Sequence, residues 1–242
     1  MGYGRSGTTM MLNTFALDER FEIFRENDPR IARNYMLVFE KVSYEISVCK
    51  TEASVMKPIL NSFDASTILE NYNRARIIWM IRDYRDVAAS AVKRFGFTVA
   101  DYLKEWVVAG NGDNWLAAGI PEETLGILRE IDSTSFSVYD WMALVWWSVN
   151  RTVLLDGLYD SSRFRLLNYE KLVKDPDHVL EELYEFLGLE YKKALGKYIH
   201  DMSVGKGSRV QLQATVQQMC DKLTEEINRS CNITSKMDTL KQ

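Results

Sequence analysis

The chain has 242 residues, of which 46% are hydrophobic and 26% charged, and its formal net charge is −4. This composition is ordinary for a globular protein, and the length fits one domain, residues 1–242, with a buried core. The small negative charge gives no indication of a nucleic-acid or membrane partner. No run approaches the roughly 20 apolar residues of a membrane span, and no signal peptide opens the chain. Three cysteines without a Cys-x-x-Cys pair argue against a disulfide framework or a zinc site. We therefore predict a cytoplasmic protein.

A glycine-rich segment opens the chain and runs directly into an apolar, helix-like stretch, GYGRSGTTMMLNTF over residues 2–15. Glycines permit tight turns, and the N–H groups and dipole of a following helix favour an anion. The spacing overlaps the P-loop pattern G-x-x-x-x-G-K-[ST], but Thr8 stands where nucleotide-hydrolysing families carry lysine, and a cation occurs at Arg5 instead. We predict a phosphate-binding loop; the alternative is a turn that binds no ligand.

The order Gly-x-x-Arg-Ser-Gly-Thr-Thr resembles the 5′-phosphosulfate-binding loop of the sulfotransferases that use 3′-phosphoadenosine 5′-phosphosulfate (PAPS). The resemblance implies a three-layer α/β/α fold with a central parallel sheet, of the P-loop NTPase-like type, with PAPS as cofactor, 3′-phosphoadenosine 5′-phosphate (PAP) as product, and no metal. The family carries an apolar strand ahead of this loop; since only Met1 precedes it here, we expect that strand to be missing or truncated. On the family pattern the 5′-phosphosulfate would be held by Gly4, Arg5, Ser6, Gly7, Thr8 and Thr9.

Two further segments place charged residues where strands are expected to end. A helix over residues 8–17 is followed by a short alternating strand from Phe21, after which Glu26 occurs, and by a helix over residues 30–40. Residues 44–52 also read as a strand, with Lys50 at its exit, where sulfotransferases commonly carry Lys-Thr-Pro. Open α/β sheets place their chemistry at the carboxyl ends of strands, so Glu26 and Lys50 are candidate site residues.

A nearly continuous apolar run over residues 76–81 predicts a strand that is buried on both faces. The segment that follows resembles the family's 3′-phosphate motif, Arg-Asp-Pro-Arg-Asp-Val-x-x-Ser, with Tyr84 in place of proline. We expect Asp86 to cap a helix, and Arg82, Ser90 and Arg94 to converge on one phosphate. The alternatives are a structural, salt-bridged turn and a Walker B strand, which an arginine just before the acid makes unsuitable for magnesium.

The middle of the chain predicts helices over residues 98–106 and 138–155, the second with tryptophans at helical spacing that we expect in the core. Between the two, residues 110–121 read as a loop, which we interpret as the acceptor pocket and lid. A strand over residues 163–167 leads to Tyr169, and Asp175-Pro176 opens a helix that Gly188 ends. This last segment resembles the sulfotransferase signature Tyr-Glu-x-Leu-x-x-Asp-Pro, of which Tyr169 is a candidate cofactor contact.

A second basic, glycine-containing loop occurs over residues 204–209, where the family closes on the 3′-phosphate. The resemblance makes four of its residues cofactor candidates: Lys206, Gly207, Ser208 and Arg209. Apolar positions at helical intervals follow the loop, and residues 231–242 read as a possible disordered tail.

The residues and the resemblance together predict in-line transfer of a sulfuryl group to a hydroxyl or amine, on a small-molecule acceptor. We assign Glu26 as the base, as in tyrosylprotein and heparan sulfotransferases, because neither His178 nor His200 follows a strand near the loop. Lys50 and Arg5 would stabilise the bridging oxygen and the sulfuryl group. Two alternatives stay open: a small-molecule or nucleoside kinase that uses ATP, and a non-catalytic nucleotide-binding relative.

Overall fold

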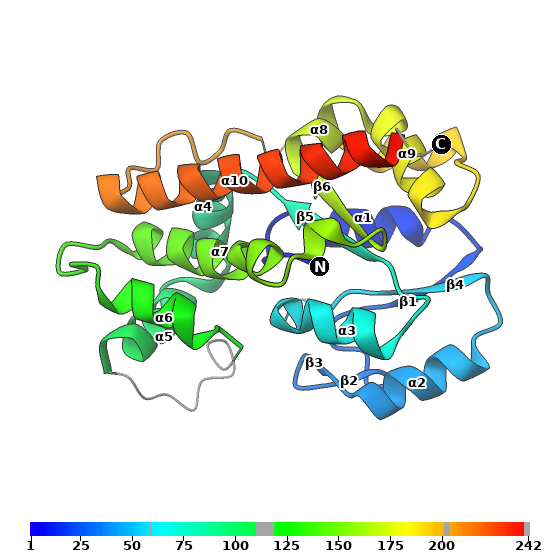
Figure 1. Cartoon of the computed structure of the whole chain (residues 1–242), viewed down its shortest axis with the longest axis horizontal. Helices are drawn as coiled ribbons and strands as arrows, with labels where there is room; N and C mark the ends of the chain where they lie inside the picture. Colours follow the sequence, from blue (N-terminus) through cyan, green and yellow to red (C-terminus); the bar gives the residue numbers. More distant parts are fainter. Residues whose placement is uncertain (59, 110–118, 201–203, 240–242) are drawn as a thin grey trace.

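The computed structural model describes residues 1–58, 60–109, 119–200 and 204–239. Within them, four strands form two parallel pairs (Figure 1). β1 (Phe21–Phe24) pairs with β4 (Ala53–Met56), and β5 (Ile77–Ile81) pairs with β6 (Phe164–Asn168). Four of the five residues of β5 are buried, as its apolar sequence predicts. The predicted α/β class with parallel strands is confirmed.

The first residues of the chain run along β5. The Met1 amino group donates to the Ile78 carbonyl oxygen at 2.6 Å, and the Met80 N–H donates to the Met1 carbonyl oxygen at 3.1 Å. Gly2 has a φ of +100°, and a Cβ on it would lie 2.3 Å from the Met80 carbonyl oxygen. Only glycine therefore fits there, and the glycine-rich loop begins beside β5.

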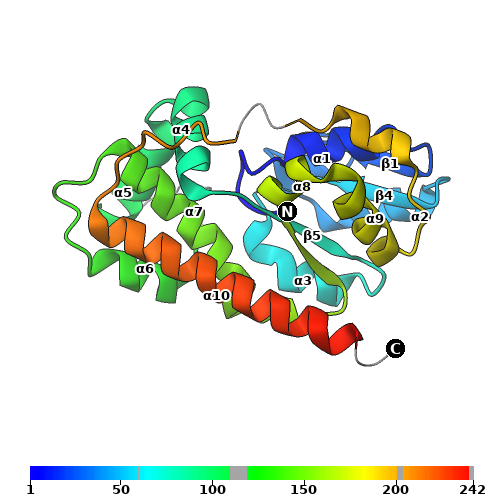
Figure 2. The same ribbon diagram turned by 90° about the horizontal axis from the view of Figure 1, so that it is seen from above.

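Helices cover both sides of the strands. α1, α8 and α9 lie on one side and α2 and α3 on the other, whereas α4 to α7 form a second group of helices (Figure 1). α10 runs along this second group and past the strands (Figure 2). The helices are α1 (Thr8–Phe15), α2 (Phe39–Val48), α3 (Ala65–Asn71), α4 (Tyr84–Phe95), α5 (Thr98–Ala109), α6 (Glu122–Arg129), α7 (Val138–Leu155), α8 (Tyr169–Lys174), α9 (Pro176–Leu187) and α10 (Ala214–Thr239), with short 3₁₀ helices η1 (Ser62–Asp64), η2 (Leu158–Asp160) and η3 (Lys193–Tyr198).

α7 is the central helix of the core and packs against α4, α5 and α10. It begins with a capping box between Ser137 and Asp140, which satisfies otherwise unpaired N–H groups at its first turn. Trp141 and Trp146 are 4% and 1% exposed, so the predicted core role of the tryptophans is confirmed. α9 likewise begins after a capping Asp175 and ends at Gly188, which has a left-handed φ of 75°.

The helix predicted over residues 30–40 is wrong. β2 (Ala32–Arg33) and β3 (Met36–Leu37) form an antiparallel hairpin there instead. Asn34 and Tyr35 connect them with φ values of +50° and +64°. Two successive residues with positive φ are typical of a tight hairpin turn, and this conformation excludes a continuous helix.

The strand predicted over residues 44–52 is also wrong, because that segment is mostly the helix α2 and the strand occurs later, as β4. The alternating side chains Tyr44, Ile46 and Val48 are 64%, 45% and 47% exposed, whereas Val42 is buried. Alternation on a solvent-exposed surface therefore imitated the pattern of a half-buried strand. Residues 231–239 belong to the end of α10, and residues 240–242 lie outside the described residues, so the disordered tail stays a prediction.

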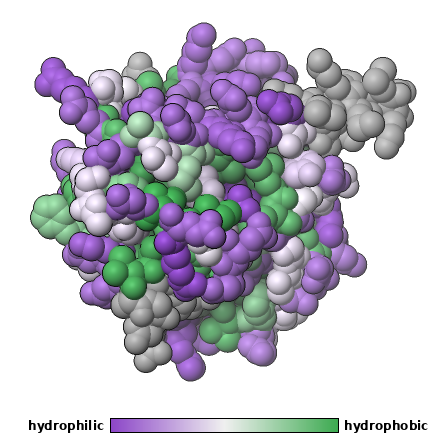
Figure 3. Space-filling view, turned by 60° about the vertical axis from the view of Figure 1, so that its left-hand side comes forward, coloured by the Kyte–Doolittle hydropathy of each residue, from purple (hydrophilic) through white to green (hydrophobic). Residues whose placement is uncertain are grey.

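The surface of the helical group mixes apolar and polar residues. On the face shown in Figure 3, hydrophobic residues gather near the centre and hydrophilic residues surround them. Exposed apolar side chains include Phe97 at 63% and Val108 at 67%, both on or next to α5. Within the described part of the chain, no helix combines the length and the apolar character that a membrane span requires.

A hydrogen bond from the indole of Trp79 connects β5 to α7. Its Nε1–H donates to Asn150 Oδ1 at 2.9 Å in the core. We expect Asn150→Ala to lower the free energy of unfolding by about 1–3 kcal/mol, because a buried donor loses its acceptor. Urea denaturation measures the loss. In a protein that already carries Trp79→Phe, and so lacks the donor, Asn150→Ala should lower the free energy of unfolding by less. If the two losses of stability simply add in the double variant, the hydrogen bond contributes nothing and the prediction is contradicted.

Candidate functional site

The glycine-rich loop has the backbone of an anion cradle. Arg5 and Gly7 have φ values of 75° and 94°, and a Cβ on Gly7 would lie 2.5 Å from Tyr169 Cδ2. α1 starts at Thr8, and its first turn carries no acidic side chain. The Ser6 hydroxyl is buried and has no hydrogen-bond partner among the described residues. A phosphate at the start of α1 fits this cradle, since it would meet free N–H groups and the positive end of the helix dipole.

A hydrogen bond joins the loop to α4. Arg5 Nε–H donates to Ser90 Oγ at 3.0 Å, so the two motifs that the sequence separates by 85 residues lie together. Partial burial, followed by the positive charges of Arg94 and Arg82, lowers the pKa of the Arg5 guanidinium. The guanidinium groups of Arg5 and Arg94 thus lie near enough to repel each other, and a bound anion would reduce that repulsion.

Arg82 contacts Asp86, Arg5 and Tyr169. Its guanidinium donates to Asp86 Oδ2 at 3.0 Å and to the Arg5 carbonyl oxygen at 3.2 Å, and lies 4.5 Å from the centre of the Tyr169 ring. This is the structural ion pair that the sequence left open as an alternative. The expectation that Asp86 caps α4 is wrong: Asp83 accepts the capping N–H bonds, because the helix begins one turn earlier, at Tyr84.

A lysine that sequence analysis missed lies at the end of β4. Lys57 is 7% exposed, and its Nζ donates to Thr9 Oγ1 at 2.7 Å and to Glu26 Oε1 at 3.1 Å. The parallel pairing of β1 and β4 brings Glu26 and Lys57 to the same edge. The Glu26 carboxylate, the Lys57 ammonium group and the Thr9 hydroxyl therefore lie together beside the glycine-rich loop.

Lys50 does not occupy the predicted strand exit. It follows α2, three residues before β4 begins, and its side chain is exposed. The sequence signal for a lysine at the strand exit was the dipeptide Lys57-Pro58, directly after the four-residue strand, which is closer to Lys-Thr-Pro than the segment at Lys50 is. The longer alternating pattern over residues 44–52 led us to predict the strand, and its lysine, too early in the chain.

The second basic loop lies against the start of α4. The N–H groups of Gly205 and Gly207 donate to Asp86 at 2.8 and 2.5 Å. Lys206, Ser208 and Arg209 are exposed, so their side chains are accessible next to the helix that carries Ser90. The structure thus brings the third predicted cofactor segment to the second.

Other predicted features lie elsewhere or outside the described residues. Residues 110–118 of the expected lid are not described; at its flank, a Cβ on Gly119 would lie 2.6 Å from the Phe63 ring. Among the described residues, no three His, Cys, Asp or Glu side chains gather as metal ligands would.

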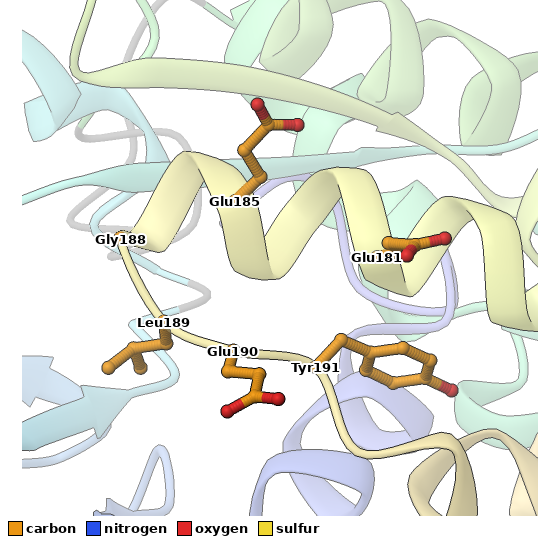
Figure 4. A pocket seen from close by; sticks show the side chains of 6 residues that line it. All are labelled: Glu181, Glu185, Gly188, Leu189, Glu190 and Tyr191. Atoms are coloured by element: carbon orange, nitrogen blue, oxygen red, sulfur yellow. The ribbon is translucent and has the colours of Figure 1, made fainter.

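A pocket of about 550 Å³ lies at the end of α9, lined by Glu181, Glu185 and Glu190 (Figure 4). Its carboxylates would repel an anionic cofactor.

Comparison with known proteins identifies the family. The family described as "Sulfotransferase domain" matches residues 1–242. The chain belongs to this family. The predicted membership of the sulfotransferase family is thereby confirmed.

Two curated sulfotransferases match part of the chain. Carbohydrate sulfotransferase 5 of Mus musculus is 25% identical over 139 residues, which are 57% of this chain and 31% of that protein. Carbohydrate sulfotransferase 1 of Danio rerio is 26% identical over 130 residues, 54% of this chain and 26% of that protein. The matched part of the chain spans less than a third of the length of either relative.

One solved structure supports the fold, and a second is less similar. The crystal structure of mouse sulfotransferase SULT7A1 complexed with PAP aligns with a TM-score of 0.54 at 14% identity, over 99% of this chain and 86% of that one. The sulfotransferase domain of the Synechococcus PCC 7002 olefin synthase is 19% identical with a TM-score of 0.47, over 79% and 64%. The predicted sulfotransferase fold is confirmed.

The loop backbone makes a prediction for Gly7. We expect Gly7→Ala to destabilise the protein by about 1–2 kcal/mol or more, because alanine adopts a left-handed φ poorly and its Cβ would collide with Tyr169. Thermal and urea unfolding measure the change. Gly126→Ala is the matched control: its Cβ meets open space inside α6, so it should stabilise the helix by about 0.5–1 kcal/mol. Equal effects at both positions would contradict the proposed loop geometry.

Proposed function

We propose that the chain is a PAPS-dependent sulfotransferase that transfers a sulfuryl group to a hydroxyl or amine of a small-molecule acceptor. The Arg5–Ser90 hydrogen bond carries the proposal, because it brings the 5′ and 3′ phosphate motifs to one place. PAPS has anionic groups on both sides of one ribose, which suits two cationic groups held together. The PAP bound to the mouse SULT7A1 structure supports the same nucleotide.

In the proposed complex, the 5′ end of the nucleotide lies on the loop and the start of α1. The Ser6 hydroxyl supports this, since a buried hydroxyl without a partner among the described residues would be satisfied by donating to a phosphate oxygen. The 3′-phosphate would lie at Ser90 and Arg94, with the loop over residues 206–209 above it. Arg82 and Tyr169 support the two phosphate sites from behind, and a direct contact of either with the nucleotide stays a prediction.

The pair Glu26 and Lys57 supports a division of catalytic work. The acceptor oxygen or nitrogen forms a bond to sulfur while the bond from sulfur to the bridging oxygen of the 5′-phosphate breaks, and the electron pair leaves with PAP. The acceptor proton passes to Glu26. Lys57, which replaces Lys50 in this role, would stabilise charge at the bridging oxygen together with Arg5. The Glu26–Lys57 contact of 3.1 Å keeps the base beside the cation that the transfer needs.

The acceptor and the location stay predictions from the sequence. The names of both curated relatives contain "carbohydrate", so a sugar hydroxyl is the first acceptor to assay. A cytoplasmic location and independence of metal belong to the same proposal.

A kinase is less consistent with the same residues. Thr8 begins α1 where a P-loop kinase carries its lysine. Asp83, the acid that follows β5, accepts two N–H bonds as the cap of α4 instead of being free for magnesium. These observations support PAPS over ATP as the nucleotide.

Ligand-induced stabilisation tests the choice of nucleotide. We expect PAP at 100 times its dissociation constant to stabilise the protein by about 2.7 kcal/mol, a rise in Tm of roughly 5–10 °C for a chain of this size. ATP with magnesium should give a much smaller rise at the same concentration. Differential scanning fluorimetry measures both; a larger shift with ATP and magnesium would favour the kinase, and no shift with either would favour a non-nucleotide role.

Substitutions at the carboxylate and the two lysines test the catalytic assignment. Glu26→Gln should lower kcat by about 10²–10⁴-fold, since the general base is lost, with unchanged PAP affinity. Lys57→Met should lower kcat by about 10²–10³-fold, as loss of one charge-stabilising group does. Lys50→Met is the matched control and should leave kcat within twofold. Steady-state kinetics with PAPS, and PAP binding by calorimetry, give these values; a larger loss at Lys50 than at Lys57 would contradict the corrected site.

A further inference from the structure

Asp86 is a buried carboxylate at a site that the proposed function gives to an anionic phosphate. It is 3% exposed in the first turn of α4. A negative charge there repels a phosphate through space. Its presence requires a reason other than capping, because Asp83 caps the helix.

The contacts of Asp86 supply that reason. Oδ1 accepts the Gly207 N–H at 2.5 Å, and Oδ2 accepts the Gly205 N–H at 2.8 Å and the Arg82 guanidinium at 3.0 Å. One carboxylate thus joins the end of β5, the start of α4, and a loop about 120 positions later in the sequence. Hydrogen bonds to an ionised group are stronger than neutral ones, so the two amide contacts anchor the loop on both sides of Lys206.

The loop backbone is fitted closely to α4 at the same place. A Cβ on Gly207 would lie 2.2 Å from the Arg85 carbonyl carbon, and Gly205 has a φ of +73°. The Ser208 N–H donates to the Gly205 carbonyl oxygen at 3.2 Å, which closes a turn. The side chains of the loop are therefore presented from a backbone that Asp86 holds.

The position of Asp86 on α4 connects the loop with the phosphate motif. Asp86, Ser90 and Arg94 are four residues apart in turn, so they lie on one face of the helix. Ser90 accepts the Arg5 hydrogen bond at 3.0 Å. Along this one face the helix therefore meets first the basic loop and then the glycine-rich loop.

We propose that Asp86 is a positioning residue that sets the Lys206–Arg209 loop over the 3′-phosphate, and so determines the preference for a 3′-phosphorylated nucleotide. The inference rests on the proposed function. Asp86 acts through the loop and does not touch the nucleotide. Its charge is engaged by two N–H groups and a guanidinium, which reduces its repulsion of the phosphate.

The substitution Asp86→Asn distinguishes positioning of the loop from repulsion of the phosphate, because the two predict opposite changes in PAP affinity. If repulsion dominated, loss of the negative charge would strengthen PAP binding. Under the proposal it weakens PAP binding, because the amide NH₂ of asparagine cannot accept the N–H of one of the two glycines. We expect PAP affinity to fall at least tenfold, while the affinity for AMP, which lacks the 3′-phosphate, changes less than twofold. Isothermal titration calorimetry with the two nucleotides measures this.

Hydrogen exchange gives a second readout that needs no ligand. In Asp86→Asn, the amides of residues 204–210 should exchange at least tenfold faster, while those of α7 keep their protection and so report an intact fold. Gly207→Ala, which displaces the loop without removing the carboxylate, should give the same selective loss of PAP affinity. Val48→Ala, at an exposed position on α2, is the control and should bind PAP as the unmodified protein does.

The outcomes separate this inference from the proposed function. If the unmodified protein binds PAP no more tightly than AMP, the proposed function fails. If it prefers PAP and Asp86→Asn keeps the same preference, or binds PAP more tightly, the positioning role of Asp86 is overturned. Unchanged exchange of residues 204–210 in Asp86→Asn would also overturn it.

Discussion

The hydrogen bond from Arg5 to Ser90 is the interaction on which the site depends. It joins a loop at the start of the chain to a helix after β5. Partial burial, and then the nearby charges of Arg94 and Arg82, lower the pKa of Arg5. A protein that holds like charges together has an electrostatic cost, which a bound anion offsets. The left-handed backbone of Arg5, with a φ of 75°, is a further local cost that a binding loop retains. The proposed binding of a doubly phosphorylated nucleotide would account for both features.

Two carboxylates organise the cations around the proposed nucleotide site. Glu26 contacts Lys57 at the paired ends of β1 and β4, and Asp86 contacts Arg82 and the basic loop at the end of β5. Each acid keeps a long, flexible cation in one position, which reduces the entropy lost when a ligand binds. The carboxyl ends of parallel strands, where open α/β folds place their ligands, thus supply both halves of the site.

Sequence predicted those parts of the fold and site that are encoded locally. The bounds of α7 follow from its apolar spacing, and the loop at Arg5 and the motif at Ser90 follow from short, specific patterns. The prediction failed where two neighbouring segments could each have formed the same strand. The exposed alternation around Ile46 imitated a strand, so Lys50 was assigned in place of Lys57, seven positions later. The contacts of Asp86 with the distant loop could not be predicted, because they depend on tertiary packing alone.

The most direct test of the account is a crystal structure of the protein with PAP. The account predicts one PAP molecule whose 5′-phosphate accepts N–H bonds from the start of α1, and whose 3′-phosphate lies within hydrogen-bonding distance of Ser90 Oγ. A PAP molecule that contacts only one of these two groups, or that lies elsewhere on the protein, would contradict it.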